Sequence, residues 1–299
     1  MFRKDGFDEF GNPVGRAFDL GGVDDGRLKG EKILFYIAYD GTKFGEQYEW
    51  HLAQQAVAER SLQMDIVVGP SNGNCTISEK MLGGYSQLWY SSDNRVTLSE
   101  NQTQMIQDFV DAGNGLLLWA DNEPFFADAN LLAKKIVRTT FSGNKPGGRI
   151  LLPGDKLEPG YFIEHPLTQG INNLFEGITI CTIARAANIK ILAQSHDKQL
   201  CMGCYDEGGK RVVLDTGFTK LIQGQFYKTA GTARYFRNIA FGFTGGCLLV
   251  YILSGLHRIS KAAHHPDFRR DAVGSKAQKR QRHEPDQHQK TNHHLSSEG

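Results

Sequence analysis

Apolar runs and amphipathic stretches alternate along the first half of the chain. The run EKILFYIAYD at residues 31–40 is continuously apolar in its middle, as expected of a strand buried on both faces of a sheet. Residues 43–62 then carry apolar side chains three and four positions apart, which is the spacing of an amphipathic helix. The same alternation continues, and it predicts strands at 63–69, 85–93 and 115–121 and helices at 78–84, 97–113 and 126–137.

This alternation of strand and helix predicts an α/β fold of the flavodoxin-like, doubly wound class. The short loops favour a mostly parallel sheet with right-handed crossovers and helices on both faces. Two helix-end signals support the prediction. Thr97 and Glu100 have the spacing of a capping box at a helix start, and Gly113 is suited to the end of the same helix.

The second half of the chain is less regular. A hairpin is predicted where Gly208 and Gly209 separate two strand-like runs, and GTARYFRNIAF is typical of a final amphipathic helix. The strands that we expect here lie at 147–155, 177–184, 189–195, 199–207 and 209–218.

Composition and charge divide the chain into three parts. Residues 1–30 are polar and rich in Gly and Asp, which indicates an extended or loosely packed lead-in, and residues 31–256 form the α/β domain. Residues 257–299 carry nine Lys and Arg against five Asp and Glu, together with seven of the ten His, and they have no apolar period. We expect this basic, His-rich tail to be disordered. The remaining 25 basic and 28 acidic residues do not indicate a nucleic-acid surface.

Two features bear on location. The chain has five Cys, a small and odd number that suits a reducing compartment, and its first residues lack the apolar run of a secretory signal, so we predict a cytoplasmic protein. Residues 239–256 carry no charge and approach the length of a membrane span. Because four Gly dilute this segment, the end of a globular helix is the favoured interpretation and a membrane segment is the alternative.

Acidic residues follow four of the predicted strands. In a parallel sheet the carboxyl ends of the strands meet at one edge, which is where ligands bind in such folds. Clustered carboxylates can hold a hard cation or raise one another's pKa, although Asp is also common in structural helix caps and turns. The strand ends place Asp40, Asp93, Asp121 and Asp215 at this edge. We predict that a ligand site there includes Asp40, Asp93, Asp121, Asn122 and Glu123.

Cysteine and histidine provide weaker candidates. CMGC at 201–204 has the spacing of a zinc or thiol-redox motif, but residues three apart on a strand point to opposite faces, so buried structural thiols are favoured. His165 has no evident nucleophile beside it in the sequence, which favours a loop-anchoring role. No metal or cofactor is assigned from these residues.

The layout resembles the class I glutamine amidotransferase-like superfamily, whose branches include true amidotransferases, trehalose-utilisation-type domains and non-catalytic versions. The resemblance covers about residues 31–245, and it implies the fold. The matching segments are ILFYIAYD, LWYSSD, DFVDAGNGLLLW, HPLTQGI, and the closing strand and helix GKRVVLD and ARYFRNIAF.

Departures from this family limit what the resemblance implies. Catalytic members look like G-x-C-x-G at the strand-to-helix elbow, with a His near the end of the domain. Here the elbow reads ADNEP at 120–124, and the closing strand ends in LDTG without a His. The resemblance therefore implies the fold without glutaminase chemistry.

The favoured function is a non-catalytic domain that binds a small ligand or a protein partner at the carboxyl edge of its sheet. The alternative is a hydrolase that uses the Asp and Glu cluster, with or without a metal, and that has Glu123 in the place of the nucleophile. The sequence leaves open whether any catalysis remains, and it does not identify the ligand.

Overall fold

The computed structural model describes seven segments of the chain. The strand predicted at 147–155, the tail at 257–299 and the candidate residue Asp40 lie outside the described residues. The described residues are 6–22, 28–38, 49–70, 73–146, 160–177, 179–221 and 230–246.

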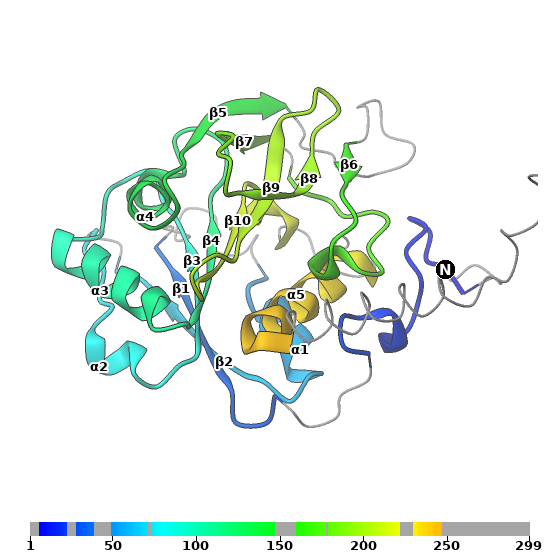
Figure 1. Ribbon diagram of the computed structural model, residues 1–299, viewed down its shortest axis with the longest axis horizontal. Coiled ribbons are helices and arrows are strands. Elements are labelled where there is room, and N and C mark those ends of the chain that lie inside the picture. The colour runs from blue at the N-terminus through cyan, green and yellow to red at the C-terminus, as the bar shows by residue number, and fades with distance from the viewer. Residues whose placement is uncertain are drawn as a thin grey trace, which may run out of the picture. The chain divides into compact units, whose positions relative to one another are not determined.

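A sheet of ten strands runs through the described part of the domain (Figure 1). Its first half is entirely parallel, and its strand order 2-1-3-4-10 matches the flavodoxin-like order, which confirms the predicted fold class. The parallel strands, in spatial order, are β2 (Gln63–Val68), β1 (Lys32–Ile37), β3 (Gln87–Ser91), β4 (Gly115–Trp119) and β10 (Arg211–Asp215).

Beyond β10 the sheet becomes antiparallel. The predicted hairpin is present, and Gly208 and Gly209 adopt φ angles of 63° and 83°, a conformation that favours glycine. Two strands were not predicted, because one is a polar run and the other has only two residues. The antiparallel strands are β9 (Leu200–Tyr205), β7 (Thr179–Ile183), β5 (Phe141–Pro146), β8 (Lys190–Gln194) and β6 (Tyr161–Phe162), of which β5 and β6 are the unpredicted pair.

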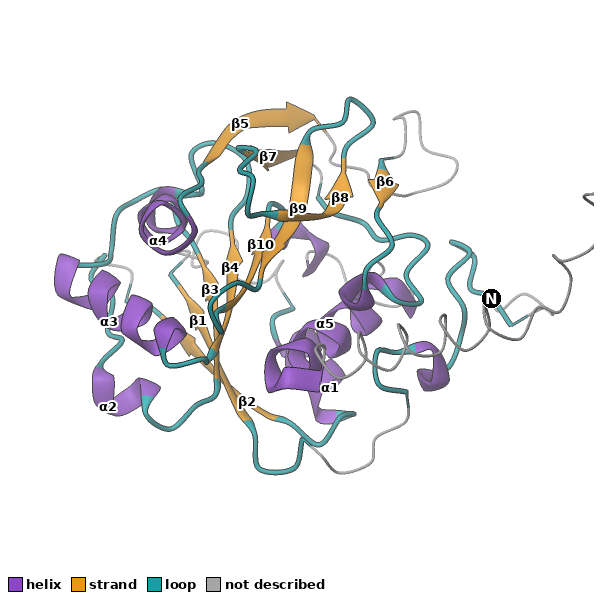
Figure 2. Ribbon diagram, viewed as in Figure 1, coloured by secondary structure: helices purple, strands orange, loops and turns teal. Residues whose placement is uncertain are grey.

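Helices cover both faces of the parallel strands (Figure 2). Because strand side chains alternate between faces, Leu34 packs on one face and Phe35 on the other, in two separate apolar clusters. The first face is covered by α2 (Glu79–Leu82), α3 (Glu100–Asp111) and α4 (Ala127–Val137), and the second by α1 (His51–Ala58) and α5 (Ala230–Phe241).

The N-cap of helix α3 is Ser99, two residues later than the predicted Thr97. Ser99 Oγ accepts from the Gln102 backbone N–H at 3.2 Å, and Gln102 Oε1 accepts from the Ser99 N–H at 3.0 Å. The capping box at Thr97 and Glu100 was therefore wrong. The Thr97 hydroxyl instead donates to Asp128 in α4 at 2.6 Å, so a partner from elsewhere in the chain moves the helix start.

The N-terminal residues also differ from the expectation. Asp19 is fully buried, and Leu20 is fully buried beside it. Residues 6–22 pack against the domain through hydrogen bonds to α5 and to residues 167–173. Residues 6–22 are therefore not loosely packed, because the polar residues Asp8, Asn12 and Asp19 are buried and hydrogen-bonded.

The candidate membrane segment is described only in its first part. Residues 239–241 complete α5, and Gly242–Gly246 form a single π-helical turn. Within the described residues, no helix combines the length and the apolarity that crossing a membrane requires. Residues 247–256 lie outside the described part.

The turn after β10 provides a test of this packing. A Cβ atom added at Gly217 would lie 1.9 Å from the Glu176 backbone oxygen. We expect Gly217→Ala to lower the free energy of unfolding by about 2 kcal/mol or more in urea denaturation. The control is Gly83→Ala, where φ is −60° and the nearest neighbour lies at 3.4 Å, with an expected change below about 0.5 kcal/mol. Equal effects would contradict the packing described.

Candidate functional site

The register of the parallel strands aligns one residue from each strand at the carboxyl edge. Ile37 pairs with Ser91, Ser91 pairs with Trp119, and Trp119 pairs with Asp215. Register partners in a sheet point to the same face, so these four side chains lie side by side on the face covered by α1 and α5. Asp215 is the charged member of this row, and it is fully buried.

Asp215 is neutralised by Lys220, which lies in the 3-10 turn Phe218–Leu221 that follows β10. Lys220 Nζ donates to both carboxylate oxygens of Asp215 at 2.7 Å. The Gly217 backbone N–H donates to the same carboxylate at 2.9 Å, and the Tyr235 hydroxyl of α5 donates to it at 2.5 Å. One carboxylate thus joins β10, the turn after it and α5.

A second carboxyl group completes this ionic network. Glu176 is fully buried, and its Oε2 lies 2.9 Å from Lys220 Nζ. Its Oε1 accepts from the backbone N–H and the hydroxyl of Thr216, each at 3.3 Å. Burial and the neighbouring Asp215 raise the pKa of Glu176 well above its usual range, whereas Lys220 opposes the rise.

Lys220 is held as a cation. Burial alone would lower its pKa, but the carboxyl groups of Asp215 and Glu176 outweigh that effect and raise the pKa above its ordinary value. The ammonium also lies 5.2 Å from the ring centres of Trp119 and Tyr235, which favours a positive charge. This lysine therefore supplies fixed charge and cannot serve as a neutral amine nucleophile.

Asp121 lies two residues beyond β4. It is a predicted site residue whose pKa is affected by the charges of Lys220 and Asp215 in this network. Burial raises the pKa of its carboxyl well above the usual range, and Asp215 adds to the rise. The Asn122 backbone N–H, which donates to Asp121 Oδ1 at 2.9 Å, and the Lys220 charge act in the opposite direction. The net effect raises the pKa, so Asp121 holds its proton more tightly than an ordinary aspartate does.

The rest of the elbow is held in place by β7 and β5. Asn122 Oδ1 accepts from the Thr179 hydroxyl at 3.0 Å, and its amide donates to the Glu123 carbonyl at 2.9 Å. The Glu123 backbone N–H donates to the Gly143 carbonyl at 3.1 Å, and a cis peptide bond precedes Pro124. The Glu123 side chain itself is exposed.

Asp93 lies at the same edge of the sheet, two residues beyond β3. Its carboxylate is buried and pairs with the half-exposed Arg95 at 3.1 Å. The structure therefore brings Asp121 and Asp215 together, keeps Asp93 in its own ion pair, and leaves Glu123 facing solvent. The predicted gathering of all the acidic residues is not tested in full, because Asp40 lies outside the described residues.

His165 has a thiol beside it that the sequence did not reveal. Cys204 Sγ lies 3.6 Å from His165 Nε2, whereas His165 Nδ1 accepts from the Leu167 backbone N–H at 3.1 Å. The Nδ1 bond places the single proton of the neutral ring on Nε2, so the ring donates to the sulfur and cannot take a proton from it. His165 thus anchors the turn Pro166–Thr168.

The remaining thiols are equally poor nucleophiles. Four of the five Cys are described, and all four are buried and free. Burial raises the pKa of Cys201 to about 12, and it raises those of Cys75 and Cys181 as well. In the described part of the chain, no group of three or more His, Cys, Asp or Glu could hold a metal ion.

Comparison with known proteins identifies a shared fold and does not identify a reaction or a ligand. No protein-family model and no curated protein match the chain. Among solved structures, a cytoplasmic protein of Salmonella typhimurium LT2 is 13% identical and has a TM-score of 0.52, with 71% of this chain and 99% of that chain covered. This likeness extends over almost the whole of that protein, and it shows a shared fold.

Two further structures are described as ThuA-like proteins. One, from Bacteroides uniformis, is 13% identical with a TM-score of 0.44 and covers 73% of this chain and 92% of its own. The other, from Parabacteroides merdae, is 14% identical with a TM-score of 0.45 and covers 73% of this chain and 91% of its own. Both scores lie below 0.5, so neither of these two structures carries an argument about the fold.

The residues that complete the buried network were not identified from the sequence. Glu176 and Tyr235 carry no local pattern that separates them from surface residues. The sequence did contain an indication of the role of Lys220. A buried aspartate at a strand end needs a cation, and Lys220 is the first basic residue after Asp215.

Removing the cation of this network should be costly. Lys220→Met leaves Asp215 buried without its partner, so we expect a loss of about 3–5 kcal/mol in the free energy of unfolding. The matched control is Lys145→Met, which breaks the partly exposed pair with Asp197 and should cost at most about 1 kcal/mol. Chemical denaturation of both variants measures the difference, and similar losses would show that Lys220 is not essential to the network.

His165 should make stability depend on pH. Burial, followed by the charge of Lys190, lowers its pKa from 6.5 to about 4. The folded state therefore binds fewer protons than the unfolded state between these values, and stability is lost as the pH falls through this window. His165→Asn keeps an acceptor for the Leu167 N–H but does not titrate.

We expect wild-type stability to fall more steeply than that of His165→Asn between pH 6.5 and pH 4.5, by about 1 kcal/mol or more. Urea denaturation at a series of pH values measures both. Parallel pH profiles for the two proteins would contradict the prediction.

Proposed function

We propose that this chain is an amidotransferase-like domain without glutaminase chemistry that binds a small polar molecule at the carboxyl edge of its sheet. Membership of that superfamily rests on the strand order, the sequence segments that resemble it, and the fold shared with the Salmonella protein. A non-catalytic role is favoured because the elbow has no thiol, because the described cysteines are buried, and because His165 donates to Cys204 instead of taking its proton.

The observation that carries the proposal is the position of Asp121. It is a buried carboxyl group at the elbow, one residue before side chains that solvent can reach, and burial raises its pKa so that the protonated form is favoured. A protonated carboxyl can donate one hydrogen bond and accept another, so it can recognise a hydroxyl, an amide or a carboxylate. The surrounding elbow is fixed by its bonds to β7 and β5, which prepares the site for binding.

Two polar atoms in the last row of the sheet add support. Ser91 Oγ and Trp119 Nε1 are buried, and neither has a hydrogen-bond partner in the described part of the chain. An unpaired buried donor costs about 1–3 kcal/mol. Because both atoms lie on the two strands next to the elbow, a polar ligand at this edge could relieve that cost.

A thermal-shift screen of divalent metals and small metabolites tests the proposal. A compound present at 100 times its Kd should stabilise the wild-type protein by about 2.7 kcal/mol and so raise its Tm. Asp121→Leu should abolish the rise, because the apolar side chain can neither donate nor accept a hydrogen bond. The control is Asp111→Leu, which removes an exposed carboxylate at the opposite edge of the sheet and should leave the rise intact.

Two results would count against the proposal. One is a screen in which no compound raises the Tm, and the other is a full rise in folded Asp121→Leu. The hydrolase alternative would be favoured if the wild-type protein cleaved a chromogenic ester and folded Glu123→Gln did not. A protein partner and a cytoplasmic location stay predictions.

A further inference from the structure

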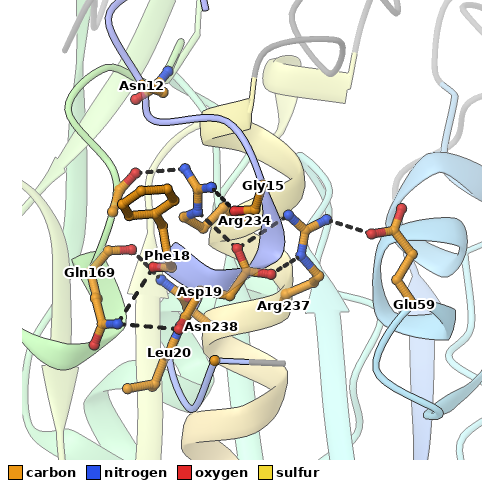
Figure 3. A network of polar contacts seen from close by, with 12 residues as sticks. Asn12, Gly15, Phe18, Asp19, Leu20, Glu59, Gln169, Arg234, Arg237 and Asn238 are labelled. Atoms are coloured by element: carbon orange, nitrogen blue, oxygen red, sulfur yellow. Dashed lines mark hydrogen bonds and ion pairs between the residues drawn. The ribbon is translucent and has the colours of Figure 1, made fainter. Parts of the chain in front are cut away.

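Residues 6–22, here called the N-terminal strap, lie across one side of α5 (Figure 3). Asp19 is at the centre of the contact. Its carboxylate accepts from Arg234 Nε at 2.8 Å and from Arg237 Nε at 2.5 Å, and all three side chains are buried. An unpaired charge is costly to bury in a protein interior. The carboxylate and the two guanidinium groups that share it are therefore held closely in position.

The other contacts of these helix residues lead to the strap and to the loop that follows the turn Pro166–Thr168, and Arg237 Nη1 also donates to Glu59 Oε2 at 3.1 Å. Arg234 donates to the carbonyls of Gly15 and Gly170, each at 2.8 Å. Asn238 Oδ1 accepts from the Leu20 backbone N–H at 2.7 Å, and its amide donates to the Gln169 carbonyl at 2.9 Å (Figure 3). The strap is thus fastened to successive turns of one helix.

The same helix reaches the carboxyl edge from its other side. Tyr235 lies between the two arginines in sequence, and its hydroxyl donates to Asp215 at 2.5 Å. Successive residues of an α-helix point about 100° apart, so Arg234 and Tyr235 face different neighbours while sharing one rigid backbone. A movement of α5 on the strap side therefore also moves the Tyr235 hydroxyl relative to Asp215.

We propose that the strap is a latch for the carboxyl-edge site: Asp19 fixes α5 and thereby holds Tyr235 on Asp215. When the strap leaves, α5 loses the two ion pairs to Asp19 and the hydrogen bonds to Gly15 and Leu20 that hold it in place, so the helix shifts. That movement breaks the Tyr235 bond and loosens the turn that carries Lys220. The latch goes beyond the proposed binding function, because the coupling exists without a ligand.

Hydrogen exchange of the full-length chain, followed by mass spectrometry without any ligand, tests the latch. In Asp19→Asn we expect amides in residues 215–221 and 231–241 to exchange about tenfold faster or more, while β3 and β4 keep their wild-type rates. The matched control is Asp128→Asn, another fully buried aspartate, whose partners are Tyr90, Thr97 and Leu98 on the opposite face. It should leave residues 215–221 unchanged.

Coupling between two sites is reciprocal, so the reverse experiment has a defined outcome. Tyr235→Phe removes only the bond to Asp215, and it should speed exchange in strap residues 15–22. If Asp19→Asn does not fold, Arg237→Lys keeps the charge but loses the bidentate contact, and it should give the same pattern with a smaller change.

Two patterns would overturn the latch. In the first, strap and α5 amides exchange faster while residues 215–221 do not. In the second, every peptide speeds up equally, which would make the strap a general stabiliser of the domain. Neither pattern depends on ligand binding, so this inference can fail while the proposed binding function holds, and the reverse also applies.

Discussion

Burial of the Lys220 ammonium sets the geometry of the carboxyl edge. A charge that is fully removed from water needs oppositely charged partners at hydrogen-bond distance, and here Asp215 and Glu176 provide them. These partners come from the end of β10 and from the segment before β7, so two distant parts of the chain must meet at one point. The positions of the turn after β10 and of the Tyr235 hydroxyl follow from that requirement, because both are bonded to Asp215.

Helix α5 connects the buried ionic network around Lys220 to a second buried ionic network, in which Arg234 and Arg237 share the carboxylate of Asp19. Its arginines would be assigned to a solvent face in an ordinary amphipathic helix, yet Arg234 is fully buried and Arg237 is almost so. The N-terminal residues take the place that solvent would occupy. The different sides of α5 therefore contact different parts of the chain. Its apolar side chains pack on the sheet, its arginines bind the N-terminal residues, and the Tyr235 hydroxyl binds the end of β10.

The sequence was informative where local pattern decides the structure. The four βα units, the hairpin at Gly208 and the final helix follow from periodicity and turn residues, although the first helix, predicted at 43–62, is observed at His51–Ala58. The sequence was less informative where a distant partner decides. Asp128 takes the Thr97 hydroxyl and moves the start of α3, and Asp19 is buried only because two arginines far along the chain meet it.

The candidate site shows the same division. Strand ends pointed to Asp121 and Asp215, since the carboxyl ends of parallel strands share an edge. The sequence could not show that Asp93 has its own partner in Arg95, or that the charge balance depends on Glu176 and Tyr235. Such pairings depend on tertiary packing and leave no periodic trace in the sequence.

The position of β10 has a consequence for how the chain folds. β4 pairs with β10 in register from Gly115 to Trp119, yet several strands and α4 separate the two along the chain. Pairings this distant in sequence close late, because the entropy of the intervening loop must be overcome first. During synthesis, one edge of an apolar central strand therefore has no partner until residue 215 has left the ribosome. That edge is the surface on which a nascent chain would need protection from aggregation.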